Sequence, residues 1–170
     1  IELAGSWNIT DRFSWTANLA LSQNKIKDFT EVVYDYAFDD ERFVVETDYT
    51  DTDISFSPNV VLGSDLGYSI KGLKLQLLNK YVGKQYLDNT SNDDRVIDSY
   101  FITDLLFTYS ISPWILKNLS LSLMVNNVFD TKYESNGYTW GYLFDGFQYQ
   151  QNNYYPQAGI NVLGGLSLKF

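Results

Sequence analysis

The densest group of side chains that could recognise a ligand lies at residues 138–155, which read YTWGYLFDGFQYQQNNYY. Aromatic residues in this segment alternate with glycine, glutamine and asparagine. Aromatic rings stack on flat ligands, and amide groups orient such ligands through hydrogen bonds. We therefore predict a ligand-contacting surface made of Tyr138, Trp140, Tyr142, Phe144, Phe147 and Tyr149. Packing against neighbouring loops, or a place in an aromatic girdle, is the alternative role for these side chains.

Carboxylates form a second group. Residues 25–55 hold ten acidic and three basic side chains, a net charge of −7. Asp48, Asp51 and Asp53 are spaced closely enough to be a weak candidate for a cation site. The segment lacks the central glycine and distal glutamate of an EF-hand. A solvated acidic loop is therefore the favoured interpretation, and we expect no metal and no cofactor.

Composition narrows the possible functions further. The chain has no histidine and no cysteine, so the commonest general base and the thiolate nucleophile are both absent. This disfavours enzymes that use a Ser–His arrangement, and we expect no enzymatic activity. The net charge of −9 also disfavours nucleic-acid binding, because few cations are available to neutralise phosphates.

The elements that must position these groups are β-strands. Apolar residues recur at every second position in seven segments, whereas we find no helical periodicity. No run of 18 apolar residues is present to form a transmembrane helix. The predicted strands are residues 1–9, 13–22, 60–70, 73–81, 101–111, 119–126 and 160–170.

The connections between these strands alternate strictly in length. Residues 10–12, 71–72 and 112–117 are short links, whereas residues 25–55, 88–98 and 130–156 are long ones, which we expect to lack regular structure. Strands of about ten residues, with tight turns at one end and long loops at the other, are typical of outer-membrane barrels. The sequence thus predicts an all-β, antiparallel transmembrane β-barrel with periplasmic turns and extracellular loops. Seven strands cannot close a bacterial barrel without open edges in lipid, so we expect part of a larger barrel.

Three blocks of sequence carry a resemblance to a known family. They are LSLSLMVNNVFDTKYE at residues 119–134, YYPQAGINVLGGLSLKF at residues 154–170 and KYVGKQYLDNT at residues 80–90. Asn126, Asn127 and Asp130 stand where a strand ends, and such side chains can bond a turning backbone. Together these blocks resemble the C-terminal end of TonB-dependent outer-membrane receptors, in the style common among Bacteroidota. Residues 1–55 fit by their strand pattern alone.

The resemblance implies that residues 1–170 are the last seven strands of a barrel of about 22 strands. The plug domain and TonB box of such receptors are absent from this chain, and we expect the remaining part of the receptor to precede Ile1. Import of a scarce, bulky nutrient is implied, such as a ferric siderophore, another iron complex or cobalamin. The implied partners are outer-membrane lipid, the TonB complex, the imported molecule, the barrel-assembly machinery and a surface lipoprotein.

The final strand has a further implied role. In the family, a terminal aromatic residue on an alternating strand is recognised by the barrel-assembly machinery. The resemblance transfers this role to Phe170, supported by Leu168, Leu166 and Val162. Other interpretations of the whole chain remain open: a lipocalin-like binding protein, a small structural outer-membrane barrel, or, less favoured, a barrel enzyme.

Overall fold

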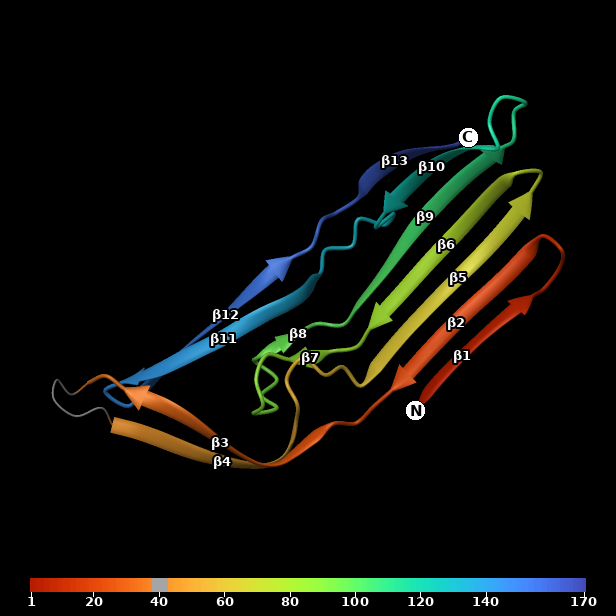
Figure 1. The fold of residues 1–170 in the computed structure, drawn as a ribbon. Helices are drawn as coiled ribbons and strands as arrows, with labels where there is room; N and C mark the ends of the chain where they lie inside the picture. The colour runs from red at the N-terminus through yellow and green to blue at the C-terminus, as the bar shows by residue number, and fades with distance from the viewer. Residues whose placement is uncertain (38–42) are drawn as a thin grey trace.

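The computed structural model describes residues 1–37 and 43–170, and the elements found there are β-strands (Figure 1). Four charged residues of the acidic segment, Asp39, Asp40, Glu41 and Arg42, lie outside the described residues. No helix in the described part of the chain is long and apolar enough to cross a membrane.

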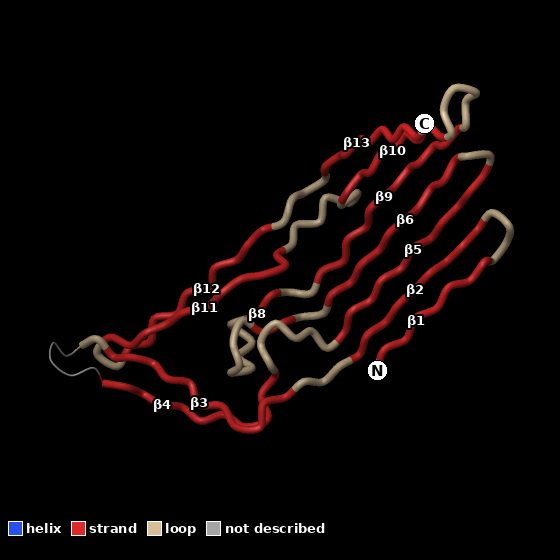
Figure 2. The backbone as a smooth tube through the Cα atoms, viewed as in Figure 1, coloured by secondary structure: helices blue, strands red, loops and turns tan. Residues whose placement is uncertain are grey.

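A seven-stranded antiparallel sheet forms the main body of the molecule (Figures 1 and 2). Its strand order is β1-β2-β5-β6-β9-β10-β13, which is the order of the seven predicted strands along the chain. Each observed bound lies within one residue of its prediction. The strands are β1 (Glu2–Asn8), β2 (Phe13–Leu21), β5 (Val60–Ile70), β6 (Leu73–Val82), β9 (Tyr100–Ile111), β10 (Asn118–Asn126) and β13 (Asn161–Lys169).

Strand register places apolar and polar side chains on opposite faces of this sheet. Paired residues share a face, so one row across six strands is Trp15, Leu66, Leu77, Leu105, Val125 and Val162. A row on the other face is Ser69, Lys74, Thr108, Ser122 and Gly165. The apolar face is exposed over much of its area. One apolar and one polar face is the pattern of a barrel wall between lipid and a lumen. In the described chain this wall is an open sheet.

The two ends of the sheet differ in the way the prediction requires. The three tight turns lie together at one end, here called the turn end, and the long connections lie at the other, the loop end (Figure 2). The β5–β6 turn is a two-residue hairpin in which Lys71 and Gly72 both have positive φ, 45° and 81°. This is the type I′ geometry, whose twist matches the twist of paired strands.

The long connections are not structureless, and in this the expectation was wrong. They contain β3 (Lys25–Asp35) with β4 (Phe43–Asp53), β7 (Gln85–Tyr86) with β8 (Val96–Ile97), and β11 (Glu134–Phe144) with β12 (Phe147–Pro156). The β11–β12 turn is Asp145-Gly146, with φ of 51° and 74°. An Asp-Gly pair between alternating aromatic residues is a strong hairpin signal, and it stands in the sequence at that point.

The two long hairpins join at the loop end. They form a four-stranded sheet of order β12-β11-β3-β4, with a single parallel contact between Leu143 and Asp35. The connection between β6 and β9 packs beside this sheet. Of the described residues, the buried hydrophobic side chains are Val82, Leu87 and Ile97. The apolar core of the chain therefore lies at the loop end, rather than on either face of the main sheet.

Candidate functional site

All six aromatic residues of the predicted ligand surface lie on one face of the β11–β12 hairpin. Tyr142 pairs with Tyr149, Phe144 pairs with Phe147, and Trp140 pairs with Gln151. Tyr138 occupies the same face because strand side chains alternate with a period of two. The structure thus brings these six side chains together, and Tyr138, Trp140 and Tyr149 are each about half exposed. Whether they contact a ligand stays a prediction.

Three of these rings lie nearly parallel. The Tyr142 and Tyr149 centroids are 5.0 Å apart with planes 12° apart, and the Trp140 and Tyr142 centroids are 5.9 Å apart with planes 16° apart. The three rings, with Gln150 and Gln151, line a hollow of about 160 Å³. We call Trp140, Tyr142 and Tyr149 the aromatic ladder. Gln151 shares the face of the ladder, whereas the Gln150 side chain lies on the opposite face, where its Nε2 donates to the Trp140 carbonyl at 3.1 Å. Partly exposed aromatic rings beside an amide are a surface that a flat ring can bind.

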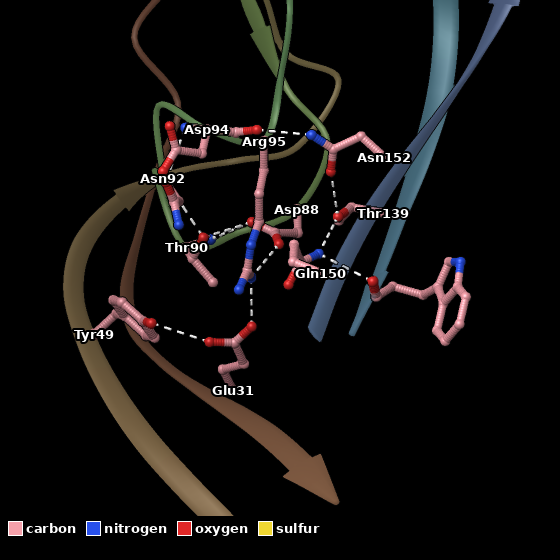
Figure 3. Close-up of polar contacts among 11 residues, drawn as sticks. Glu31, Tyr49, Asp88, Thr90, Asn92, Asp94, Arg95, Thr139, Gln150 and Asn152 are labelled. Atoms are coloured by element: carbon pink, nitrogen blue, oxygen red, sulfur yellow. Dashed lines mark hydrogen bonds and ion pairs between the residues drawn. The ribbon is translucent and has the colours of Figure 1, made fainter. Parts of the chain in front are cut away.

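The opposite face of the same hairpin packs on the β6–β9 connection. Asn152 donates from Nδ2 to the carbonyl of Asp94 at 2.7 Å, and the Tyr154 hydroxyl donates to the carbonyl of Val96 at 3.0 Å. Thr139 donates to Oδ1 of Asn152 at 2.7 Å, so the two strands present linked polar groups to the connection (Figure 3). Polar contacts therefore hold one face, and the aromatic ladder occupies the other.

A buried arginine, which the sequence analysis did not single out, links three segments at the loop end (Figure 3). Arg95 is 4% exposed, and its Nη1 donates to Oδ2 of Asp88 at 2.7 Å and to Oε1 of Glu31 on β3. The second oxygen of Glu31 accepts a hydrogen bond from the Tyr49 hydroxyl on β4 at 3.0 Å. Thr90 donates to Asp88 through its backbone amide at 3.0 Å and its hydroxyl at 2.6 Å. We call Arg95, Glu31, Asp88 and Tyr49 the arginine cluster.

Burial and the charged hydrogen bonds of this cluster shift pKa values in opposite directions at Arg95 and in the same direction at Tyr49. Burial by itself lowers the pKa of Arg95, but the hydrogen bonds to Asp88 and Glu31 outweigh it, so the pKa of this guanidinium is raised. Burial, followed by the hydrogen bond to Glu31, raises the pKa of Tyr49. Arg95 is therefore charged and Tyr49 is neutral at any physiological pH. In the sequence, the arginine cluster is indicated only by one arginine among four acidic residues in the segment 88–98. This signal is weak because Glu31, the partner on β3, is distant in the sequence.

A small cavity of about 180 Å³ adjoins the arginine cluster. Its walls come from the two hairpins: Val33, Val45 and Thr47 of the β3–β4 hairpin, and Leu143 and Gln148 of the β11–β12 hairpin. Glu31, Tyr49, Asn92 and Arg95 complete the lining. Leu143 and Gln148 are a cross-strand pair on the face opposite the aromatic ladder. This cavity and the ladder are consequently two separate places in the fold.

The tips of the two hairpins are joined by one carboxylate. Asp35 at the end of β3 is buried, and it accepts backbone hydrogen bonds from Ala37 at 3.0 Å and from Asp145 and Gly146 at 3.2 Å. The amide of Tyr36 also donates to the carbonyl of Leu143 at 3.0 Å. The tip that carries the aromatic ladder is thus held by β3.

The acidic candidates for a cation site are not brought together. Asp48 accepts from the Thr30 hydroxyl at 2.7 Å, and Asp53 pairs with Lys25 at 2.9 Å. Asp51 pairs with Lys27 at 2.5 Å. Among the described residues no group of three or more acidic side chains is placed to hold a metal ion. Each carboxylate instead has a separate partner on the neighbouring strand.

Two of the three polar residues predicted to bond backbone at the end of β10, Asn127 and Asp130, do so, whereas Asn126 donates from Nδ2 to Oδ1 of Asn161 on β13 at 2.8 Å. Asn127 is 3% exposed; its Nδ2 donates to the carbonyl of Thr131 at 2.9 Å, and its Oδ1 accepts from the Thr131 amide at 2.9 Å. Asp130 accepts from the Ile160 amide at 2.9 Å, just before β13. This backbone hydrogen bond and the Lys132 ammonium lower the pKa of Asp130.

The residues proposed for assembly line the apolar face of the final strand. In β13, Val162, Leu166 and Leu168 pair with Val125, Leu121 and Leu119 of β10. Phe170 follows the strand and is 79% exposed, at the turn end beside the β9–β10 connection (Figure 1). The structure places these side chains together but does not test recognition by an assembly factor.

Comparison with known proteins identifies the family. The family described as TonB dependent receptor-like, beta-barrel matches residues 1–128, so the chain belongs to that family. This match includes residues 1–55, where the sequence analysis had only a strand pattern. TonB-dependent receptors are receptors and transporters of the Gram-negative outer membrane, rather than enzymes.

A solved structure agrees with the fold. The chain is similar to the crystal structure of the ferric yersiniabactin uptake receptor FyuA from Yersinia pestis, with a TM-score of 0.59 and 18% sequence identity. The similarity covers 96% of this chain and 22% of FyuA, so the chain spans about a fifth of that receptor's length. At this identity the likeness shows the fold alone. A search of curated protein sequences finds no match.

Proposed function

We propose that this chain forms the C-terminal part of an outer-membrane receptor that imports a scarce, bulky nutrient, such as a ferric siderophore, another iron complex or cobalamin. The family supports the receptor class. The uptake of ferric yersiniabactin by FyuA, which shares the fold, is in keeping with an iron complex as the substrate. Family membership favours this function over the lipocalin-like alternative and over a non-energised structural barrel.

The observation that carries the proposal is the aromatic ladder. Its three nearly parallel rings stand on one face with Gln151, beside a hollow of about 160 Å³, and Trp140 and Tyr149 are each about half exposed. Iron chelates and cobalamin are large, partly flat molecules that aromatic faces and amides can hold together. In this proposal the loop end is extracellular and the ladder contacts the arriving ligand. The arginine cluster and Asp35 keep the supporting hairpins in place.

Transport itself needs parts beyond this chain. We propose that a plug domain, preceded by a TonB box, fills the lumen against the polar face of the sheet. Energised pulling by the TonB complex then rearranges the plug and releases the ligand inward. Outer-membrane lipid surrounds the apolar face, and the barrel-assembly machinery recognises Phe170 with Leu168, Leu166 and Val162. A surface lipoprotein is a further partner in this proposal.

The test is ligand binding by the intact receptor, using radioactive iron in a panel of ferric chelates and labelled cobalamin. The double variant Trp140→Ala, Tyr149→Ala is expected to weaken binding by at least tenfold, since each lost stacking contact costs about 1 kcal/mol. Trp114→Ala is the matched control, because Trp114 is 95% exposed in the β9–β10 turn at the other end of the sheet. Equal affinity of the double variant and the control would remove the ladder from the binding site. Absence of binding to every member of the panel would reject these substrate classes.

A further inference from the structure

The sequence contains a single asparagine–glycine pair, Asn136-Gly137, and it lies near the start of β11. An asparagine side chain can be attacked at Cγ by the backbone nitrogen of the next residue, in a reaction that closes a five-membered ring. A glycine at the next position favours this reaction, because a residue without a Cβ reaches the required backbone conformation easily. The pair is therefore the place in this chain where such a reaction is chemically most favoured.

The structure brings the reacting groups of this pair together. The backbone amide of Gly137 donates a hydrogen bond to Oδ1 of Asn136 at 2.8 Å. Because a carbonyl bond is about 1.2 Å long, the Gly137 nitrogen lies no more than about 4 Å from Cγ of Asn136. Reacting atoms that are about 3–3.5 Å apart are in position for attack. The Asn136 side chain is thus already folded over the nitrogen that attacks it.

The surroundings of Asn136 leave room for ring closure. The pairing of β11 with β12 shifts register between Glu134 and Asn136. The residue opposite Glu134 is Pro156, which has no N–H to donate to the ladder. Asn136 is also exposed, so water reaches its side chain. This position is consequently less constrained than one inside a regular strand pair.

Other asparagines of the same hairpin have different partners. Asn152 donates from Nδ2 to the carbonyl of Asp94 at 2.7 Å (Figure 3). Oδ1 of Asn153 accepts from the Gln151 amide at 3.1 Å. Each of these side chains is bonded to a group other than the backbone nitrogen that follows it, in contrast to Asn136.

We propose that Asn136 is a deamidation site in the folded receptor. The Gly137 nitrogen loses its proton to hydroxide and bonds to Cγ of Asn136, and the Cγ–Nδ2 bond breaks. The Nδ2 group takes a proton from water and leaves as ammonia, so that a succinimide ring joins the two residues. One water molecule then opens either carbonyl–nitrogen bond of the ring, which yields aspartate or isoaspartate. The reaction does not depend on which ligand the receptor imports.

The modification changes the hairpin that carries the aromatic ladder. Both products add one negative charge, and isoaspartate also adds one atom to the backbone just before Gly137. The chain is closely packed there, since a Cβ at Gly137 would lie 2.7 Å from the carbonyl oxygen of Asn153 and 3.0 Å from Cδ2 of Leu87. The longer backbone of isoaspartate therefore disturbs the pairing of Tyr138 with Asn153.

The experiment follows the intact receptor in detergent micelles during incubation in mildly alkaline, heavy-oxygen water. Hydrolysis of the succinimide places heavy oxygen in the product, which separates this deamidation from modification during later digestion. The tryptic segment 133–169 also contains Asn152, Asn153 and Asn161, which serve as internal controls. Mass spectrometry is expected to show deamidation at Asn136 at least about tenfold faster than at each control. Equal rates at the four asparagines would overturn the proposal.

The synthetic peptide 133–169 gives the rate without the fold. Because the folded chain holds the reacting groups together, Asn136 is expected to react in the receptor within about tenfold of its rate in the peptide. A receptor in which Asn136 is protected more strongly than this would also overturn the proposal. Asn136→Gln is the matched variant, since its longer side chain would have to close a six-membered ring. Hydrogen exchange at Tyr138 is expected to accelerate on ageing of the unaltered receptor and to stay constant in Asn136→Gln; equal acceleration in both would reject the proposed effect on the hairpin.

Discussion

The carboxylate of Asp35 accepts a hydrogen bond from the backbone amide of Gly146 at 3.2 Å, across 111 residues of sequence. The same carboxylate accepts from Asp145 and from Ala37. Gly146 belongs to the tight turn whose positive φ angles close the β11–β12 hairpin. One buried side chain on β3 thereby holds the turn of the hairpin that carries the aromatic ladder.

Asp35→Ala is expected to release this turn. Three backbone amides lose their acceptor, and a partly buried donor without a partner costs about 1–3 kcal/mol. Hydrogen exchange at Ala37, Asp145 and Gly146 is therefore expected to accelerate by about tenfold or more. Asp28→Ala, an exposed carboxylate on the same strand, is the control. Unchanged exchange in Asp35→Ala would show that the turn is held by its own geometry.

Arg95→Gln is expected to loosen the loop end as a whole. Without the guanidinium, Glu31 and Asp88 face each other at a partly buried site with no cation between them, at a cost of about 3 kcal/mol. Faster hydrogen exchange is expected in residues 86–97 and along β3 and β4, with the main sheet unaffected. Lys84→Gln is the control, since Lys84 and Asp93 form an exposed pair with side chains 45% and 80% accessible. Similar exchange in both variants would contradict a central role for Arg95.

The two glycines of the type I′ turns are expected to differ in tolerance to alanine. Both have positive φ, 81° at Gly72 and 74° at Gly146, which costs an alanine about 1 kcal/mol. A Cβ at Gly72 would also lie 2.3 Å from the carbonyl oxygen of Ser110, whereas none of the described atoms lies within 4 Å of a Cβ at Gly146. Gly72→Ala should therefore lower the thermal unfolding temperature of the receptor more than Gly146→Ala does. The reverse order would contradict the register of β5, β6 and β9 at this turn.

Acidification is expected to weaken the link between residue 130 and the start of β13. The pKa of Asp130 is lowered from its ordinary value of 3.8 by the Ile160 amide and the Lys132 ammonium. The folded state favours the charged form of Asp130. The stabilisation that the Asp130 carboxylate gives the folded state is therefore fully present above pH 3.8 and is lost as the pH falls through the lowered pKa. The amide resonance of Ile160 should titrate in that range, and Asp130→Asn should abolish the titration. A resonance that is unchanged down to the pH of unfolding would contradict the contact.

Much of the fold could be read directly from local patterns. The alternation of apolar and polar residues predicts the seven strands of the main sheet, because successive side chains of a strand point to opposite faces. It also predicts which face each row occupies, as for Trp15, Leu66 and Leu77. The same alternation accounts for the shared face of the six aromatic candidates. The sequence prediction did not include the β11–β12 hairpin, although its Asp-Gly pair is a hairpin signal. The prediction rested on the length of the connection rather than on its turn residues.

Residue pairs that contact each other across long sequence separations could not be predicted from local patterns. Glu31 and Arg95 are separated by 64 residues, and Asp35 and Gly146 by 111. The pairing of each carboxylate with its donor depends on how the two hairpins pack against each other and against the β6–β9 connection. No local periodicity encodes that arrangement. The sequence by itself determined an antiparallel barrel wall with apolar and polar faces, because strand alternation is a local property. Only the tertiary structure decided where the buried arginine, the hairpin clamp and the cavity lie, because each is formed by segments that meet after folding.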